Sequence, residues 1–188
     1  MNLLIQLDVQ LFLLINHLQN RFLDALVLGI NWITEGGLLW LLICFFILIF
    51  CKKEKKRKII LILITLLINS WLVNVPLKLF LFRTRPNEAI EGVKILGKIW
   101  SNNSFPSGHI AASVAVLLIL AYLFRIRQRW FIFSSITFIL FLGFARVYVG
   151  MHYPTDVLGG IIVGLVSSAV IIWLDKQVKF PEEKNEFG

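Results

Sequence analysis

Residues 104–123 read SFPSGHIAASVAVLLILAYL, a short polar segment followed by an apolar run without a charged residue. Such a run is typical of a helix in a lipid bilayer, where the backbone must satisfy its own hydrogen bonds. The whole 188-residue chain shares this character, since 58% of it is hydrophobic, 16% is charged and the mean hydropathy is +0.81. Soluble domains carry roughly 25% charged residues. The composition excludes a soluble globular domain and predicts an all-α, polytopic transmembrane helical bundle.

The apolar segments predict five to six spans. Five of them are long enough to be convincing: 36–51, 58–82, 109–124, 130–149 and 155–174. The segment 22–35 is apolar but short, and it ends at Gly36 and Gly37. Three arrangements are open to it, because a full crossing needs about 20 apolar residues: a thin crossing, pairing with the N-terminal segment, or a turn back.

The first 20 residues are apolar but are interrupted by Asp8, Asn16 and His17. They have no basic leader and no small-residue cleavage site, so we expect them to be retained rather than removed as a signal peptide. An amphipathic helix at the membrane interface or a short first span fits this pattern, with His17 solvated. Cys44 and Cys51 have no partner motif and are interpreted as small apolar residues of a membrane helix.

Lysine and arginine residues gather on alternate loops, which must share one side of the membrane. Twelve of the nineteen are found in three places: 52–58, 125–129 and the C-terminal Lys176, Lys179 and Lys184. By the positive-inside tendency, that side is the cytoplasm. Contact with anionic lipid headgroups accounts for the net charge of +8, so nucleic acid is not expected as a partner. The loops 83–108 and 147–155 then lie on the outer side.

The first polar motif of the outer side lies in KLFLFRTRP, residues 78–86. Lys78 and Arg85 are seven residues apart, which places them on one face if the helix continues, and Pro86 then turns the chain into the loop. Two cations that converge at a membrane face require an anion, and phosphate is the obvious candidate. Arg83 is interpreted as snorkelling toward headgroups. Snorkelling explains Lys78 less well, because Lys78 lies inside the apolar run.

The second motif is Pro106, Ser107, Gly108 and His109 at the start of a predicted span. Ser107 is a suitable N-cap, Gly108 permits close approach of a ligand to the backbone, and the first turn directs free N–H groups into the outer loop. This arrangement predicts an anion site. A plain capped helix would account for Ser107 but would leave Gly108 and His109 unexplained.

The third motif joins Arg146, His152 and Asp156 across the loop between two predicted spans. Asp156 follows His152 by four residues, a spacing that places a carboxylate beside an imidazole once a helix has begun at Pro154. Such a carboxylate fixes the histidine tautomer and leaves the other ring nitrogen free to attack. Taken singly, Arg146 and Asp156 could form a simple charge pair and His152 could lie at headgroup level, but three motifs on one side make coincidence a poor explanation.

Together these motifs resemble the three-part signature of the type 2 phosphatidic acid phosphatase and vanadium haloperoxidase superfamily, in order and in internal spacing. The resemblance covers about residues 65–175, most of the chain. One departure is Ala145, which stands where the family usually has a serine before the arginine of the third motif. The departure removes one hydroxyl near the site and none of the charged or nucleophilic groups.

The resemblance implies a helical bundle in which a histidine forms a phosphohistidine that water later hydrolyses. His152 would be the nucleophile, Asp156 its orienting partner, and His109 the acid that protonates the leaving oxygen and then activates water. The remaining motif residues would hold the phosphate oxygens: Lys78, Arg85, Ser107, Gly108 and Arg146. No metal and no other cofactor is expected, because cationic side chains take the place of Mg²⁺ and no carboxylate cluster is present.

These roles predict a single membrane phosphatase domain over 1–188. It comprises an interfacial helix and short first span over 1–35, a catalytic core over 65–175 and a cytoplasmic tail over 176–188. The expected location is a bacterial inner membrane, with the active site facing the periplasm or the outside. The lipid bilayer and a phosphorylated membrane lipid are the expected partners, and the oligomeric state is left open.

Several functional alternatives remain open from sequence. A haloperoxidase would use the same residues to hold vanadate, but those enzymes are typically soluble. A lipid phosphotransferase would share the site, and a transporter or another non-enzymatic anion-binding membrane protein would not need the histidines. Candidate substrates of a lipid phosphatase are undecaprenyl diphosphate, phosphatidylglycerol phosphate, phosphatidic acid and the phosphate of lipid A.

The loop 87–100, NEAIEGVKILGKIW, carries apolar residues at helical spacing: Ile90, Val93, Leu96, Ile99 and Trp100. This spacing predicts a short amphipathic helix on the membrane surface. Lys94 and Lys98, one turn apart, would then face a substrate headgroup. Simple adhesion of the loop to the membrane is an equal alternative.

Overall fold

The computed structural model describes residues 3–50, 56–69, 75–100 and 103–177, and within these ranges the regular structure is helical. The prediction of an all-α bundle is confirmed. In chain order the elements are α1 (Leu3–Asn16), α2 (Arg21–Thr34), η1 (Glu35–Gly37), α3 (Leu38–Phe50), α4 (Lys56–Leu67), α5 (Val75–Phe80), α6 (Pro86–Ala89), α7 (Gly108–Leu123), α8 (Arg129–Tyr148) and α9 (Pro154–Gln177).

Within the described ranges, three helical stretches are long and apolar enough to cross a membrane: Arg21–Phe50, Arg129–Tyr148 and Pro154–Gln177. The first of these stretches includes residues 22–35, whose arrangement the sequence left open. That segment forms α2 and continues into α3 through a break at Gly36 and Gly37, whose φ angles are 59° and 79°. Such positive φ values are accessible to glycine and unfavourable for most other residues, so the two glycines redirect the chain between α2 and α3.

The segment 58–82 differs from the prediction of one continuous span. The structure gives α4 and the short α5, and α5 ends at Phe80. Residues 82–85 have no helical backbone. Lys78 and Arg85 therefore do not share one helix face, and the predicted reason for their proximity is wrong.

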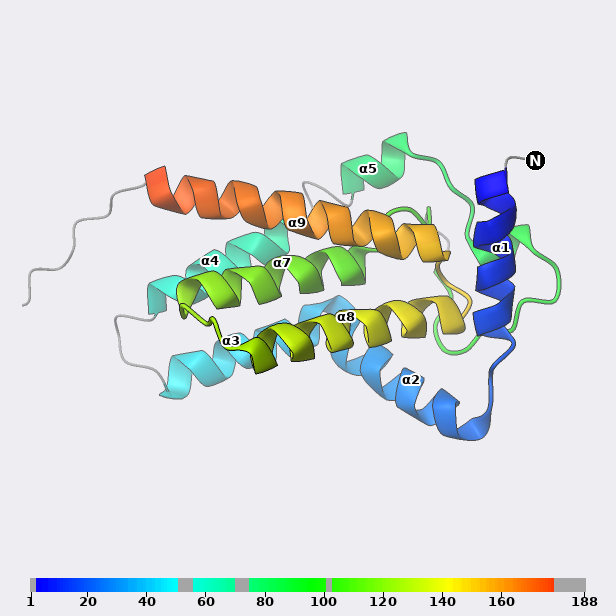
Figure 1. The fold of residues 1–188 in the computed structure, drawn as a ribbon, viewed down its shortest axis with the longest axis horizontal. Coiled ribbons are helices and arrows are strands. Elements are labelled where there is room, and N and C mark those ends of the chain that lie inside the picture. The colour runs from blue at the N-terminus through cyan, green and yellow to red at the C-terminus, as the bar shows by residue number, and fades with distance from the viewer. Residues whose placement is uncertain (1–2, 51–55, 70–74, 101–102, 178–188) are drawn as a thin grey trace, which may run out of the picture.

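The helices form an elongated bundle in which α3, α4, α7, α8 and α9 run lengthwise, as Figure 1 shows. Helix α1 lies across one end of this bundle, where α7 and α9 begin and α8 ends. Phe12 of α1 is fully buried against Val147 and Tyr153, with the rings of Phe12 and Tyr153 5.6 Å apart. The N-terminal helix is thus docked onto the bundle by a buried face, while the exposed His17 agrees with the sequence prediction.

Asn16 at the end of α1 is also buried and ties three segments together. Its side-chain amide donates to the backbone oxygens of Lys94 and Tyr148, each at 2.8 Å, and its Oδ1 accepts from the Lys94 N–H at 3.0 Å. Asn16 was interpreted from sequence only as an interruption of an apolar run. In the structure it fixes the outer loop to the end of α8.

The outer loop does not form the predicted amphipathic helix. Helix α6 ends at Ala89, and residues 90–100 are irregular. Gly92 and Gly97 have φ angles of 77° and 87°, which interrupt any helix, and the Leu96 N–H bonds to the backbone oxygen of Val149 at 3.3 Å. Leu96 and Trp100 pack against a buried cluster that contains Val149 and Met151. The apolar spacing of this loop therefore reflects contact with the bundle.

Cys44 is buried in an apolar cluster with Trp40, Ile119 and Ile171, as expected of a small apolar residue. Cys51 lies outside the described residues, as do positions 52–55 and 178–188. The described basic residues Arg125, Arg127, Arg129 and Lys176 lie at the end of the bundle opposite α1.

Close packing between α7 and α9 sets the geometry of the bundle. A Cβ on Gly160 would lie 2.6 Å from the backbone oxygen of Ser107, and one on Gly164 would lie 2.7 Å from that of Ala111. Only glycine permits this approach, which is the small-residue packing common between membrane helices. The two helices therefore hold a fixed register along their length.

Replacing Gly160 by alanine is expected to destabilise the protein by about 1–3 kcal/mol, because the new methyl group meets a backbone oxygen that cannot move aside. For a chain of this size that corresponds to a drop of roughly 2–4 °C in the thermal midpoint for each kcal/mol. Differential scanning fluorimetry in detergent measures the shift. Gly29→Ala is the matched control, because a Cβ at Gly29 in α2 meets nothing within 4 Å. Equal thermal midpoints for the two variants would contradict the α7–α9 contact.

Candidate active site

The predicted polar residues converge at the end of the bundle that α1 covers. A cavity of about 130 Å³ is lined by Lys78, Arg85, Trp100, Gly108, His109, Arg146 and His152. This volume is several times the ~30 Å³ that a water molecule occupies in the liquid. Ser107 and Asp156 are fully buried beside it and complete the predicted set. Residues from all three sequence motifs thus meet at one point.

Charge in this cavity is strongly one-sided. Lys78, Arg85 and Arg146 contribute cations, and among the described residues no carboxylate lines the cavity. Arg85 donates from Nη1 to the Met151 backbone oxygen at 2.8 Å, and Arg146 donates from Nη1 to Oδ1 of Asn31 at 2.7 Å. Both partners are neutral. An anion in the cavity would accept further hydrogen bonds from the cationic side chains that line it.

Unpartnered polar atoms surround the same space. Four buried side-chain atoms of the motif residues have no hydrogen-bond partner among the described residues: Ser107 Oγ, His109 Nε2, Arg146 Nε and His152 Nδ1. Buried polar groups in proteins are nearly always bonded, so these atoms are candidates for contact with a ligand. Ser107 occupies the N-cap position of α7, as predicted, but its hydroxyl makes no capping bond and is available to a ligand.

His152 lies in the short connection between α8 and α9. Its Nδ1 is 3.5 Å from Oδ2 of Asp156, a close contact that does not meet the geometry of a hydrogen bond. Burial lowers the pKa of His152 to about 4, and the guanidinium groups of Arg146 and Arg85 act in the same direction while Asp156 opposes them. The imidazole is accordingly neutral at pH 7, which is the form that can act as a nucleophile.

The first turns of α7 and α9 are joined by a backbone bond. The Ser107 N–H donates to the Asp156 backbone oxygen at 3.0 Å. Asp156 Oδ2 also accepts from the Tyr153 N–H at 2.8 Å. These bonds hold the two histidine-bearing segments beside each other.

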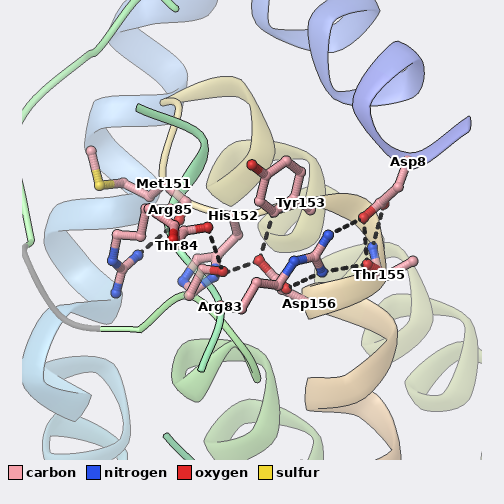
Figure 2. A network of polar contacts seen from close by, with 10 residues as sticks. Asp8, Arg83, Thr84, Arg85, Met151, His152, Tyr153, Thr155 and Asp156 are labelled. Carbon is pink, nitrogen blue, oxygen red and sulfur yellow. Dashed lines mark hydrogen bonds and ion pairs between the residues drawn. The ribbon is translucent and has the colours of Figure 1, made fainter. Parts of the chain in front are cut away.

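Arg83 is the main correction to the predicted site. Rather than snorkelling to headgroups, its guanidinium donates from Nη1 to Asp156 Oδ1 and to Thr155 Oγ1, both at 2.6 Å, and from Nη2 to Asp8 of α1. It also stacks over the Tyr153 ring, 4.0 Å from the centroid. Figure 2 shows this network beside Arg85 and His152.

Sequence reasoning missed Asp8 and Thr155 as well. Asp8 is buried, and besides Arg83 it accepts from the Thr155 N–H at 3.0 Å and from the Thr155 hydroxyl at 2.6 Å. One signal was available, because an aspartate within an apolar run is costly unless it is paired. Its partner could not be identified from sequence, since it lies 75 residues away.

The proposed headgroup lysines do not line the cavity. Lys98 pairs with Glu35 at 3.2 Å, lies 4.2 Å from the centre of the Trp100 ring, and lines a neighbouring pocket of about 150 Å³ that shares Trp100 and Arg146 with the site. Lys94 is exposed and contributes only backbone atoms to the contact with α1. Ala145 is buried among Val27, Tyr148 and Val149, so the position of the missing serine is apolar here.

The fold and the site define a class of proteins: membrane-type helical bundles with a buried, cationic cavity and two histidines at one end. The chain belongs to the PAP2 superfamily, whose family model matches residues 58–179, well over half of it. The resemblance drawn from the three motifs is thereby confirmed.

Comparison with individual proteins agrees with this membership. Undecaprenyl-diphosphatase BcrC of Bacillus subtilis (strain 168) is 36% identical over 100 residues, which are 53% of this chain and 49% of that protein. Phosphatidylglycerophosphatase B of the same strain is 32% identical over 116 residues, 57% of this chain and 54% of that protein. The chain thus spans about half the length of these curated relatives in the matched regions.

A crystal structure of LpxE from Aquifex aeolicus has a similar fold, with a TM-score of 0.75 and 26% sequence identity. The match covers 89% of this chain and 95% of that one. The homologues are membrane lipid phosphatases by name, and the apolar helices agree with a location in a membrane.

Proposed function

We propose that this protein is an integral membrane lipid phosphatase that removes a phosphate from a lipid headgroup through a phosphohistidine on His152. The observation that carries the proposal is the cavity in which three cations, two histidines and the orphaned Ser107 hydroxyl converge. A phosphoryl group would accept from the orphaned donors and neutralise the cations together. Positioning and charge stabilisation of this kind supply most of the catalysis in phosphoryl transfer.

In the proposed reaction, Nε2 of His152 attacks phosphorus while the bond from phosphorus to the lipid oxygen breaks. His109 donates a proton to the departing oxygen; the bound phosphate favours the protonated form of this histidine. A water molecule then attacks the phosphohistidine, the N–P bond breaks, and His109 takes up the proton from water. The products are the dephosphorylated lipid and inorganic phosphate, with both histidines restored.

The remaining residues hold this arrangement. Lys78, Arg85 and Arg146 neutralise the oxygens of the transferring group, and the Ser107 hydroxyl and the backbone at Gly108 donate to them. Asp156 keeps the proton of His152 on Nδ1. Candidate substrates are the lipids that carry an accessible phosphate: undecaprenyl diphosphate, phosphatidylglycerol phosphate, phosphatidic acid and lipid A. Phosphate release by the purified protein across this panel tests the activity and ranks the substrates.

The two histidines should differ in their effect on the covalent intermediate. His152→Ala is expected to abolish turnover and the acid-labile phosphoenzyme, because the nucleophile is lost. His109→Ala should lower turnover by about 10²–10⁴-fold, the usual worth of general acid–base help, yet still form phosphoenzyme with an aryl phosphate whose leaving group needs no proton. Quenched-flow capture with labelled substrate measures both species.

Asp156→Asn should fall between the two histidine variants, with a cooperative thermal transition that shows the variant still folds. His17→Ala is the matched control, since His17 is exposed in the turn after α1 and does not line the cavity, and it should behave as the wild type. A phosphoenzyme that persists in His152→Ala but is absent in His109→Ala would reverse the two assigned roles.

Activity should survive excess EDTA and be inhibited by orthovanadate, which adopts the five-coordinate geometry of the transition state in the cationic cavity. The reason is the use of cationic side chains in place of a metal. Within the described part of the chain, no group of three or more His, Cys, Asp or Glu side chains could hold a metal ion. Phosphate release with and without chelator measures this, and full loss of activity in EDTA that Mg²⁺ restores would contradict it.

The site is proposed to face the outside of the cell, in a bacterial inner membrane. The basic residues 125–129 and Lys176 lie at the opposite end of the bundle, which by charge bias is the cytoplasmic end. In a protein without Cys44 and Cys51, an impermeant thiol reagent should label Glu91→Cys in intact cells and leave Arg127→Cys unlabelled until lysis. Both positions are exposed. The opposite labelling pattern would reverse the orientation.

A further inference from the structure

We propose that Arg83 and Asp8 are positioning residues for phosphoryl transfer: through Asp156 they fix the orientation of His152. The inference rests on the proposed function of the site. Neither residue lines the catalytic cavity. Any effect they have on the reaction must therefore pass through the residues they contact.

The two carboxylate oxygens of Asp156 have different partners. Oδ2 faces the connection that carries the nucleophile, 3.5 Å from His152 Nδ1 and 2.8 Å from the Tyr153 N–H. Oδ1 is held from the other side by Arg83 Nη1 at 2.6 Å. The terminal torsion of an aspartate is soft. Without the bond to Oδ1, the carboxylate could rotate and the already long contact with His152 could be lost.

Arg83 is itself held in place by contacts with α1 and with the start of α9. Its guanidinium bridges Asp156 of α9 and Asp8 of α1, and the Thr155 hydroxyl and the Tyr153 ring complete its surroundings. Two carboxylates and one guanidinium carry a net negative charge, so each carboxylate depends on the shared cation. Asp8 in turn binds Thr155 through both its N–H and its hydroxyl, which fixes the first turn of α9.

Helix α1 has one side buried against the bundle and another side exposed. The side of α1 that carries Asp8 and Phe12 is buried against the bundle. Large apolar residues of the same helix are exposed to the surroundings: Leu3, Leu4, Ile5, Leu7, Leu11 and Leu14. Helix α1 thus exposes apolar residues on one side and on the other contacts Arg83 through Asp8. Arg83 in turn contacts Asp156, the carboxylate beside His152 (Figure 2).

The decisive experiment combines pre-steady-state kinetics with a double-mutant cycle. Arg83→Gln is expected to lower the rate constant of phosphoenzyme formation by about 10- to 100-fold. Losses of this size are usual when an outer-shell partner that orients a functional side chain is removed. The burst amplitude, which counts working sites, should stay near that of the wild type. Arg83→Lys should recover part of the rate, because an ammonium can serve one carboxylate but not both. Asp8→Asn should give a smaller slowing.

Coupling through Asp156 gives the sharpest distinction from a purely structural role. In an Asp156→Asn background, Arg83→Gln should cost less than about threefold, because the group through which Arg83 acts is already altered. Asp24→Asn is the matched control: Asp24 accepts from the Tyr148 hydroxyl at 2.7 Å near the same end of the bundle and has no link to Asp156. Its rate constant should be within twofold of the wild type.

Two results would overturn the inference. The first is a double variant whose rate constant falls by the product of the fold-changes of Arg83→Gln and Asp156→Asn, which would mean that the two residues act independently. The second is a reduced burst amplitude with a normal rate constant, which would mean that Arg83 only supports folding. Failure of the proposed function is recognised separately, because the wild-type protein itself would then form no phosphoenzyme.

Discussion

The backbone bond from Ser107 N–H to the Asp156 oxygen is the constraint on which the site depends. It joins the first turns of α7 and α9, and each of those turns carries or adjoins a histidine of the cavity. Gly160 lies one turn beyond Asp156 and removes the side chain that would otherwise hold the helices apart. The relative position of α7 and α9 along their axes thus sets the positions of His109 and His152. A shift along the helix axes would separate His109 from His152.

The cationic cavity is energetically costly while it is empty. Burial of an ionised group costs several kcal/mol after relaxation unless opposite charge compensates it. Arg85 and Arg146 are hydrogen-bonded to a backbone oxygen and to an amide, and both partners are neutral. An anion that binds there would offset part of this burial cost. A tetrahedral, multiply charged group with acceptors on several sides uses the site best, which is why phosphate chemistry fits it better than the binding of a small monovalent anion.

Sequence reasoning predicted the convergence of the three motifs because each lies where an apolar segment meets a loop, and alternate loops of a bundle must meet at one end. It did not predict contacts that depend on tertiary placement. Arg83 has partners 75 residues before it and 73 residues after it, and nothing local distinguishes it from a snorkelling arginine. The apolar spacing of the outer loop 87–100 also gave a wrong prediction, that of an amphipathic helix. Gly92 and Gly97 adopt conformations that a helix excludes, and the apolar residues there pack on the bundle.

Lys78 and Arg85 illustrate a prediction whose conclusion held for a different reason. Both line the cavity, as expected, but α5 ends at Phe80 and the chain reaches Arg85 in a non-helical conformation. The seven-residue spacing is compatible with one helix face and equally with a helix followed by a loop that folds back. Only the contacts of Arg83 and Arg85 with residues 151–156 distinguish the two.

The non-helical segment also explains why two arginines two residues apart have different tasks. Arg85 binds the Met151 oxygen within the α8–α9 connection, and Arg83 binds Thr155 and Asp156 just after it. His152 lies between these two attachment points. The short stretch from Arg83 to Arg85 therefore holds the chain on both sides of the proposed nucleophile. One arginine does so from within the cavity and the other from outside it, so the first can meet substrate while the second transmits the position of α1.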